Sequence, residues 1–180
     1  TTHKEVLEWK TDVIQSFSSE QRIALRAEPR QSFNYTYMLT PHEFSMAKAL
    51  STQWAHRVYG IPVWSELSHV GPIPTGATSI SVDTIAADYR SNDIIIVWQD
   101  SENELAVETT SVQAGSISLK LPLPRSFTNA YVAPLRFART YSGVDYTRVG
   151  GEAVVSKATF SVTKNTQLSA AAGYPTYRGK

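Results

Sequence analysis

The sequence predicts a mainly β fold, a sandwich or barrel, with one flanking α-helix at about residues 41–58. Three observations support this prediction. Residues 20–39 contain two runs in which apolar and polar side chains alternate, and a period of two is typical of half-buried strands. A strong helix start signal follows these runs. The rest of the chain consists of short apolar runs separated by turn residues, which is typical of all-β architectures.

The first elements are strands on both sides of a break at Pro29. Residues 6–14 form a strand-like start, and a polar turn at 16–19 follows. Ile23 and Leu25 then lie on one face of the first alternating run. Because proline cannot donate a hydrogen bond to a sheet, Pro29 marks a bend or a sheet edge. Four residues repeat the alternation after the break: Phe33, Tyr35, Tyr37 and Leu39.

The helix has a clear start and an expected end. Thr40 suits the N-cap, Pro41 suits the first helical position, and Glu43 stands where a capping-box carboxylate reaches back to the Thr40 amide. Gly60 is expected to supply a left-handed C-terminal residue, and Pro62 prevents continuation. One apolar stripe is expected to pack on a sheet; it comprises Ala47, Leu50, Trp54 and Val58.

Short strands are expected after the helix. They are residues 61–67, 79–84, 93–99, 104–112, 116–121, 130–139 and 152–163. Residues 94–98 are apolar on both faces, so this strand is expected to be central, with the helix as a cover for one face. The segment 71–76 contains two prolines and is interpreted as a rigid connector that cannot bind phosphate.

Composition limits the function classes. With 180 residues, 42% of them hydrophobic, the chain can form one well-packed domain, expected at 1–165, followed by an extended segment at 166–180. That segment is interpreted as a frayed tail, a linker or an arm that docks on a neighbour. A net charge of +1 gives no electrostatic reason for specific nucleic acid or membrane binding. No cysteine is present, which excludes disulfides and thiolate metal sites.

No catalytic, cofactor or metal site is expected, and the chain is not predicted to be an enzyme. His42 and His56 lie on one predicted helix but are 14 residues apart, roughly 21 Å along its axis, so they cannot share a metal ion. The acidic residues of 100–104 lack the pattern of a calcium loop and are interpreted as a solvated turn.

Aromatic residues support an alternative function, a carbohydrate-binding β-sandwich. Four residues are candidates for a sugar-binding face: Trp64, Trp98, Tyr131 and Tyr141. Core packing is the expected role of Trp54 and Trp98, since both lie in apolar patterns. Exposed tyrosine and tryptophan would equally serve a protein interface, so aromatic content alone does not decide between these functions.

Several segments resemble the distal tail, or tail-hub, proteins of long-tailed bacteriophages. The resemblance covers most of residues 5–163 and begins with Trp9-Lys10-Thr11-Asp12-Val13, followed by Glu20-Gln21-Arg22 and Pro29-Arg30. Later strands also look like those of the family, namely 93–98, the hairpin 108–121, 130–135 and 158–162. The matching positions are framework residues: Trp9, Asp12, Arg22, Arg26, Pro29 and Arg30.

The resemblance implies a tail-tube-like β-sandwich or barrel and a structural role in the virion tail, with assembly in the host cytoplasm. The chain would form a ring, six-fold rather than three-fold, that joins the tail tube to the tip or baseplate proteins. DNA would pass through the lumen of such a ring, so the lumen should be polar and not strongly cationic.

Five residues are candidates for contacts between proteins in that assembly. Arg26 and Arg30 flank the break at Pro29 and are expected to make hydrogen bonds or ion pairs at a sheet edge or subunit contact. A solvated position on the strand is the alternative for both arginines. Tyr174, Tyr177 and Arg178 belong to the terminal segment and are of residue types enriched in interfaces.

Overall fold

The computed structural model describes residues 1–15, 20–24 and 29–163. This part of the chain is mainly β and contains one α-helix, which confirms the predicted fold class. It divides into two compact units: unit 1 contains the described residues of Thr1–Tyr59 and those from Phe137 on, and unit 2 contains Gly60–Arg136. The single domain at 1–165 stays a prediction, and the segment 166–180 lies outside the described residues.

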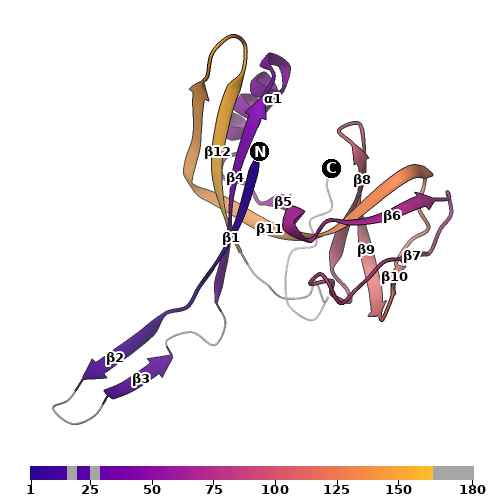
Figure 1. The fold of residues 1–180 in the computed structure, drawn as a ribbon, viewed down its shortest axis with the longest axis horizontal. Coiled ribbons are helices and arrows are strands. Elements are labelled where there is room, and N and C mark those ends of the chain that lie inside the picture. Colours follow the sequence, from indigo (N-terminus) through magenta and orange to yellow (C-terminus); the bar gives the residue numbers. More distant parts are fainter. Residues whose placement is uncertain (16–19, 25–28, 164–180) are drawn as a thin grey trace. The chain divides into compact units, whose positions relative to one another are not determined.

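Unit 1 contains the helix and five complete strands, which can be followed in Figure 1. These elements are β1 (Thr2–Glu8), β2 (Thr11–Gln15), β3 (Glu20–Ala24), β4 (Arg30–Leu39), α1 (Pro41–Gln53) and β12 (Val154–Val162). The long strand β11 (Phe127–Arg148) begins in unit 2 and continues into unit 1.

Unit 2 contains the remaining short strands and one 3-10 turn. They are β5 (Tyr59–Pro62), which starts at the last residue of this part of unit 1, η1 (Trp64–Glu66), β6 (Ser68–Ile73), β7 (Ser79–Ser81), β8 (Ile94–Asp100), β9 (Asn103–Gln113) and β10 (Ser116–Leu119).

Hydrogen-bonded neighbours follow the order β1-β4-β12-β11-β8-β9-β10-β7, an open path that does not close into a barrel. β5 and β6 also pair with β11, and β2 and β3 form a separate two-stranded sheet. The pairings with a described register are all antiparallel. Antiparallel sheets tolerate water on one face, and unit 1 shows this clearly.

The sheet of unit 1 has one apolar face and one polar face. Phe33 and Tyr35 of β4 are buried, as the predicted alternation requires. Tyr35 lies opposite Ala158 of β12 in the ladder, and Ala158 is buried too. The intervening residues of β4, such as Asn34, are directed to the other face because side chains alternate along a strand. This alternation confirms the strand predicted after Pro29.

Helix α1 begins where the sequence predicts. Thr40 accepts a hydrogen bond from the Glu43 amide at 3.4 Å, and the Glu43 carboxylate accepts one from the Thr40 amide at 2.8 Å, so the capping box is complete. Pro41 occupies the first helical position. These contacts also lower the pKa of the Glu43 carboxyl, because the Thr40 amide and hydroxyl donate to its charged form.

The predicted end of α1 is wrong. The helix stops at Gln53 with Trp54 as C-cap, and the Arg57 amide then bonds the Trp54 carbonyl in a turn. The Arg57 guanidinium lies 4.3 Å from the centre of the Trp54 ring, which holds this turn against the helix end. Gly60 is not a left-handed cap; it belongs to β5, where Leu135 packs so closely that a Cβ would lie 3.0 Å from its side chain.

The face of α1 that packs on the sheet also differs from the prediction. Phe44, Ala47 and Ser51 are half-buried, whereas Leu50 and Trp54 are exposed. Phe44 and Ser51 both contact Tyr146 of β11, through a ring contact at 5.2 Å and a hydroxyl bond at 3.1 Å. The predicted stripe failed because an aromatic pair and a hydroxyl bond at the sheet place the helix, rather than its most hydrophobic face.

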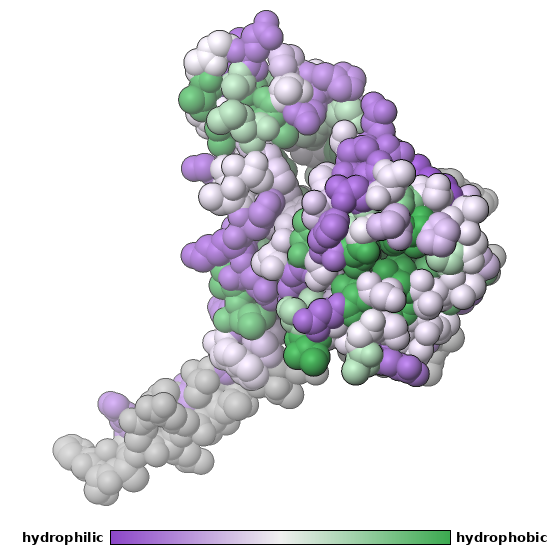
Figure 2. Space-filling model, turned by 45° about the vertical axis from the view of Figure 1, so that its right-hand side comes forward, coloured by the Kyte–Doolittle hydropathy of each residue, from purple (hydrophilic) through white to green (hydrophobic). Residues whose placement is uncertain are grey.

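Unit 2 has the principal hydrophobic core. Twelve buried residues form one cluster: Ile73, Ile80, Val82, Tyr89, Ile95, Val97, Ile117, Leu119, Leu123, Phe127, Ala130 and Val132. Half-buried hydrophobic residues pack around it, among them Val70, Leu105 and Val107. In the view of Figure 2, hydrophobic side chains gather in the middle of unit 2 and polar ones surround them.

Two further expectations need correction. The connector at 71–76 contains the end of β6, which pairs with β11 through shifted registers that accommodate Gly71 at a φ of +77°. Strand β8 is central, as predicted. The role of α1 as a cover of β8 stays a prediction, because α1 belongs to unit 1 and β8 to unit 2. β11 continues well past residue 139, through a register shift before Val144.

Candidate functional site

Exposed hydrophobic side chains are concentrated in unit 1. Of the nine large hydrophobic residues that are exposed in the described chain, seven belong to it: Leu7, Trp9, Met38, Met46, Leu50, Trp54 and Val149. Single exposed hydrophobic residues are ordinary, whereas contiguous groups of them mark interaction surfaces.

Three of these side chains form a stripe along α1. Met46, Leu50 and Trp54 are four residues apart, so they lie on one side of the helix, and they are 54%, 50% and 43% exposed. The helix turns a different side, with Phe44 and Ser51, toward Tyr146. The stripe is therefore available to a further surface.

The sheet of unit 1 has two edges that pair with no further strand of the described chain. β1 pairs with β4 alone among the described strands, and six of its seven residues are exposed. At the other edge, residues 144–148 of β11 pair with β12 and with no other described strand. Such edges carry backbone donors and acceptors that can pair with a strand of another chain.

Strand direction makes the two edges compatible with each other. The four strands β1, β4, β12 and β11 are joined by three antiparallel ladders, so their directions alternate. β1 and β11 therefore run in opposite directions. If a second copy continued the sheet in the same orientation, its β1 would lie antiparallel to β11 of the first copy, which is the more favourable pairing.

The polar face of this sheet carries many small hydroxyl and amide side chains. Asn34 and Thr159 are joined by a hydrogen bond of 2.8 Å between β4 and β12. Charged residues on this face are of both signs: Lys4, Arg30, Arg139 and Lys157 are cations, and Glu8 and Asp145 are anions. The face that bears α1 is on the opposite side, because Tyr146 alternates with Asp145 along β11.

The two-stranded sheet of β2 and β3 has no further strand in the described chain. A hairpin of two strands is marginally stable in water on its own, so it usually requires a packing partner. Trp9, which precedes this hairpin, is 61% exposed. Asp12 is exposed on β2, and the side chain of Arg22 is not described.

Of the five sequence-predicted contact residues, the structure describes only Arg30. Arg30 is exposed at the first position of β4, opposite Glu8 of β1. Arg26 and the terminal group of Tyr174, Tyr177 and Arg178 lie outside the described residues. The role of these residues in an interface stays a prediction.

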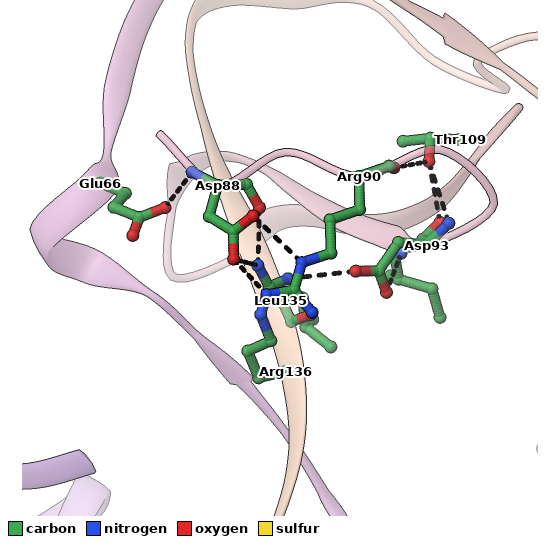
Figure 3. A network of polar contacts seen from close by, with 8 residues as sticks. Glu66, Asp88, Arg90, Asp93, Thr109, Leu135 and Arg136 are labelled. Carbon is green, nitrogen blue, oxygen red and sulfur yellow. Dashed lines mark hydrogen bonds and ion pairs between the residues drawn. The ribbon is translucent and has the colours of Figure 1, made fainter. Parts of the chain in front are cut away.

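Sequence reasoning missed the main polar network of unit 2, which centres on Arg136 (Figure 3). Only 4% of the Arg136 side chain is exposed. Its guanidinium donates to the Asp93 carboxylate at 3.2 Å, to the Asp88 carboxylate at 3.0 Å and to the Asp88 carbonyl at 2.6 Å. Arg90 also pairs with Asp88. The network ties β11 to the segment between β7 and β8.

Burial and charge act differently on the two carboxyl groups of this network. Burial raises the pKa of Asp93 and outweighs the opposing effects of the Ile94 amide and Arg136. Burial also works to raise the pKa of Asp88, but hydrogen bonds and charges from Arg90 and Arg136 outweigh it and lower the pKa. A lone arginine within the apolar run 130–138 was the sequence signal for this network, since buried arginine is rarely unpaired.

The aromatic candidates are partly brought together. Trp64, Trp98 and Tyr131 form one cluster in unit 2 and are all half-buried, while the side chain of Tyr141 is not described. The prediction of core packing is wrong for Trp54, which is 43% exposed. Trp98 lies on the sheet face opposite the hydrophobic cluster, because its neighbour Val97 belongs to that cluster.

No group of three or more His, Cys, Asp or Glu residues in the described part of the chain could hold a metal ion. The described part also has no helix long and apolar enough to cross a membrane. Comparisons with protein-family models and with curated proteins find no match to this chain.

Proposed function

We propose that this protein is a structural component that self-associates into a ring through unit 1, as the tail-hub proteins of long-tailed phages would. The observation that supports this function best is the four-stranded sheet of unit 1. It has two edges of opposite strand direction that pair with no further strand in the described part of the chain, and it has one polar face.

A ring requires a heterologous contact, in which one surface of a copy meets a different surface of the next. The edges β1 and β11 meet this requirement, because β11 of one copy can pair with β1 of the next. Continuation of the sheet around a ring would bury the backbone groups of both edges and produce a closed barrel with four strands from each copy. In this arrangement, each edge pairs with the opposite edge of a neighbouring copy of this chain.

The two faces of the sheet then have separate roles. The polar face, with Asn34 and Thr159, would line the lumen, where its anions would offset part of the charge of its cations and limit the retention of DNA that passes through. Helix α1 on the opposite face would lie outside, where its exposed stripe could contact neighbouring copies or other tail proteins. The tail tube protein and the tip or baseplate proteins are the partners that this role requires.

The test is the mass of the purified chain by light scattering over a concentration series, followed by negative-stain imaging. A ring with a central opening, six-fold by analogy with the tail hub, is the expected result. Leu50→Glu on α1 should weaken the assembly. Ile85→Glu is the matched control, since Ile85 is a large hydrophobic residue of unit 2 that is 89% exposed. A monomer at all concentrations would contradict self-association.

A further inference from the structure

We propose that unit 2 carries a saccharide-binding site on the face of its sheet opposite the hydrophobic cluster. This site goes beyond the ring function, which rests on unit 1. Val97 and Val132 belong to the cluster, and their chain neighbours Trp98 and Tyr131 therefore project from the other face. The six side chains that carry the proposal are Trp64, His69, Trp98, Glu104, Asn129 and Tyr131.

Four of these residues form a row across adjacent strands. Tyr131 of β11 lies opposite His69 of β6 on one side and opposite Trp98 of β8 on the other, and Trp98 lies opposite Glu104 of β9. Ring centres are 4.9 Å apart for His69 and Tyr131 and 5.8 Å apart for Tyr131 and Trp98. Since neighbouring strands are about 4.8 Å apart, the row is about 14 Å long, enough for more than one sugar ring.

Trp64 adds a wall to this row. It comes from η1, and its ring centre lies 5.9 Å from that of Trp98 at an angle of 77°. Both side chains are half-buried, so part of each ring is accessible. The C–H face of a pyranose ring can pack on the accessible part of one ring while the second ring limits its position.

Polar groups stand at both ends of the row. The Glu104 carboxylate is exposed next to Trp98, and His69 is exposed next to Tyr131. His69 Nε2 lies 2.7 Å from the Asn129 side-chain oxygen. The Gln99 side-chain oxygen accepts hydrogen bonds from the amides of Thr128, at 2.9 Å, and Asn129, at 3.3 Å, which fixes the start of β11 beside β8. Carboxylate and amide groups can bond neighbouring sugar hydroxyls.

The composition of the row favours a saccharide over other ligands. No lysine or arginine is among its six side chains, so it lacks the cations that nucleic acid binding requires. The next residues on the same face, Ile96 and Ala133, are buried, so the accessible part of the half-buried aromatic rings is one row wide. A stable protein interface needs about 800 Å² from each partner, far more than one such row supplies.

The experiment titrates the full chain with three defined hexasaccharides, cellohexaose, maltohexaose and chitohexaose, and follows tryptophan fluorescence and calorimetric heat. Saturable binding of at least one is expected. Trp98→Ala should weaken it by about tenfold or more, which corresponds to about 1.4 kcal/mol. His69→Ala and Glu104→Gln, at exposed positions, should weaken it by a smaller factor without a change in the unfolding transition.

Trp54→Ala is the matched control, since Trp54 is a half-exposed tryptophan of unit 1 and its loss should leave saccharide binding unchanged. The proposal is overturned if none of the three hexasaccharides binds. It is also overturned if His69→Ala and Glu104→Gln both bind as tightly as the unmodified chain. Capture of another protein by this row, lost in Trp98→Ala, would assign the face to a protein partner instead.

Discussion

The two units differ in how much apolar surface they remove from water. Unit 2 contains 17 of the 22 buried hydrophobic residues of the described chain, whereas unit 1 contains seven of the nine large hydrophobic residues that are exposed. Hydrophobic burial is the main driving force of folding. Unit 2 therefore has a core of its own, and unit 1 depends more on further burial by assembly.

The two units also differ in their polar interactions. In unit 2, a buried arginine with two carboxylates fixes β11, an arrangement that tolerates little change. In unit 1, by contrast, polar side chains such as Asn34 and Thr159 are joined across the open sheet face. We infer that unit 2 is the rigid part of each copy and that unit 1 supplies its joints.

The largest expected effect is the loss of Arg136. Arg136→Leu leaves Asp93 buried without its cation, and it should lower the free energy of unfolding by about 3–5 kcal/mol. Arg139→Leu, at an exposed position of the same strand, is the control and should change it by less than about 0.5 kcal/mol. Urea unfolding measures both. Equal losses would show that Arg136 is not the centre of unit 2.

The second-largest effect is expected from a substitution in the core of unit 2. Ile117 is fully buried, and Ile117→Ala should cost about 2–5 kcal/mol through lost burial and a cavity. Leu50→Ala on α1 removes an exposed side chain and should cost less than about 1 kcal/mol in the monomer. The same urea series compares them. A larger loss for Leu50→Ala than for Ile117→Ala would reverse the comparison between the units.

A smaller effect is expected from the helix cap of unit 1. Thr40→Ala removes the hydroxyl that accepts from the Glu43 amide, and it should destabilise α1 by about 1 kcal/mol. Hydrogen exchange of the first turn should speed up, while exchange in β8 should not change. If exchange in β8 accelerated equally, the two units would unfold as one cooperative body.

The smallest effect concerns pH. The pKa of Asp93 is raised by burial, so its contribution to stability falls as pH rises from the unfolded carboxyl pKa to the folded one. The pKa of Asp88 is lowered, so its contribution is lost as pH falls below the unfolded value toward the folded one.

Asp93→Asn should remove the decline in stability that is expected as pH rises, and it should keep the loss of stability in acid that comes from Asp88. The free energy of unfolding, measured between about pH 2 and 7, tests this, because the range spans the ordinary carboxyl pKa. If the free energy of unfolding of Asp93→Asn still declined equally as pH rises, Asp93 would not be the source of the decline.

Local signals in the sequence were sufficient for much of the fold. The capping box at Thr40 and Glu43 placed the helix start because all of its contacts lie within one turn. The alternation of Phe33 and Tyr35 placed β4 and its buried face for a similar reason. Both features depend on neighbours in the chain, and these are visible in a sequence.

Features set by distant contacts could not be predicted. The packing face of α1 is decided by Tyr146, which is 95 residues from Ser51 in the chain. β6 was missed because Gly71 and Pro72 look like a connector until β11 provides a ladder with shifted register. The partners of Arg136 come from a separate segment, 43 and 48 residues away. No local pattern specifies such pairings.

The most direct test of the proposed ring is a cysteine cross-link between β1 and β11. The chain has no cysteine, so Thr2→Cys or Lys4→Cys can be combined with Asp145→Cys without interference. Within one copy these strands are separated by β4 and β12, about 14 Å, and a disulfide needs Cα atoms within about 7 Å. A bond can therefore form only between copies.

The ring account predicts a ladder of covalent oligomers on a non-reducing gel that ends at a fixed number of copies, with neither single variant giving more than a dimer. A double variant that stays monomeric, or that stops at a dimer, would contradict the joining of β1 to β11 around a ring.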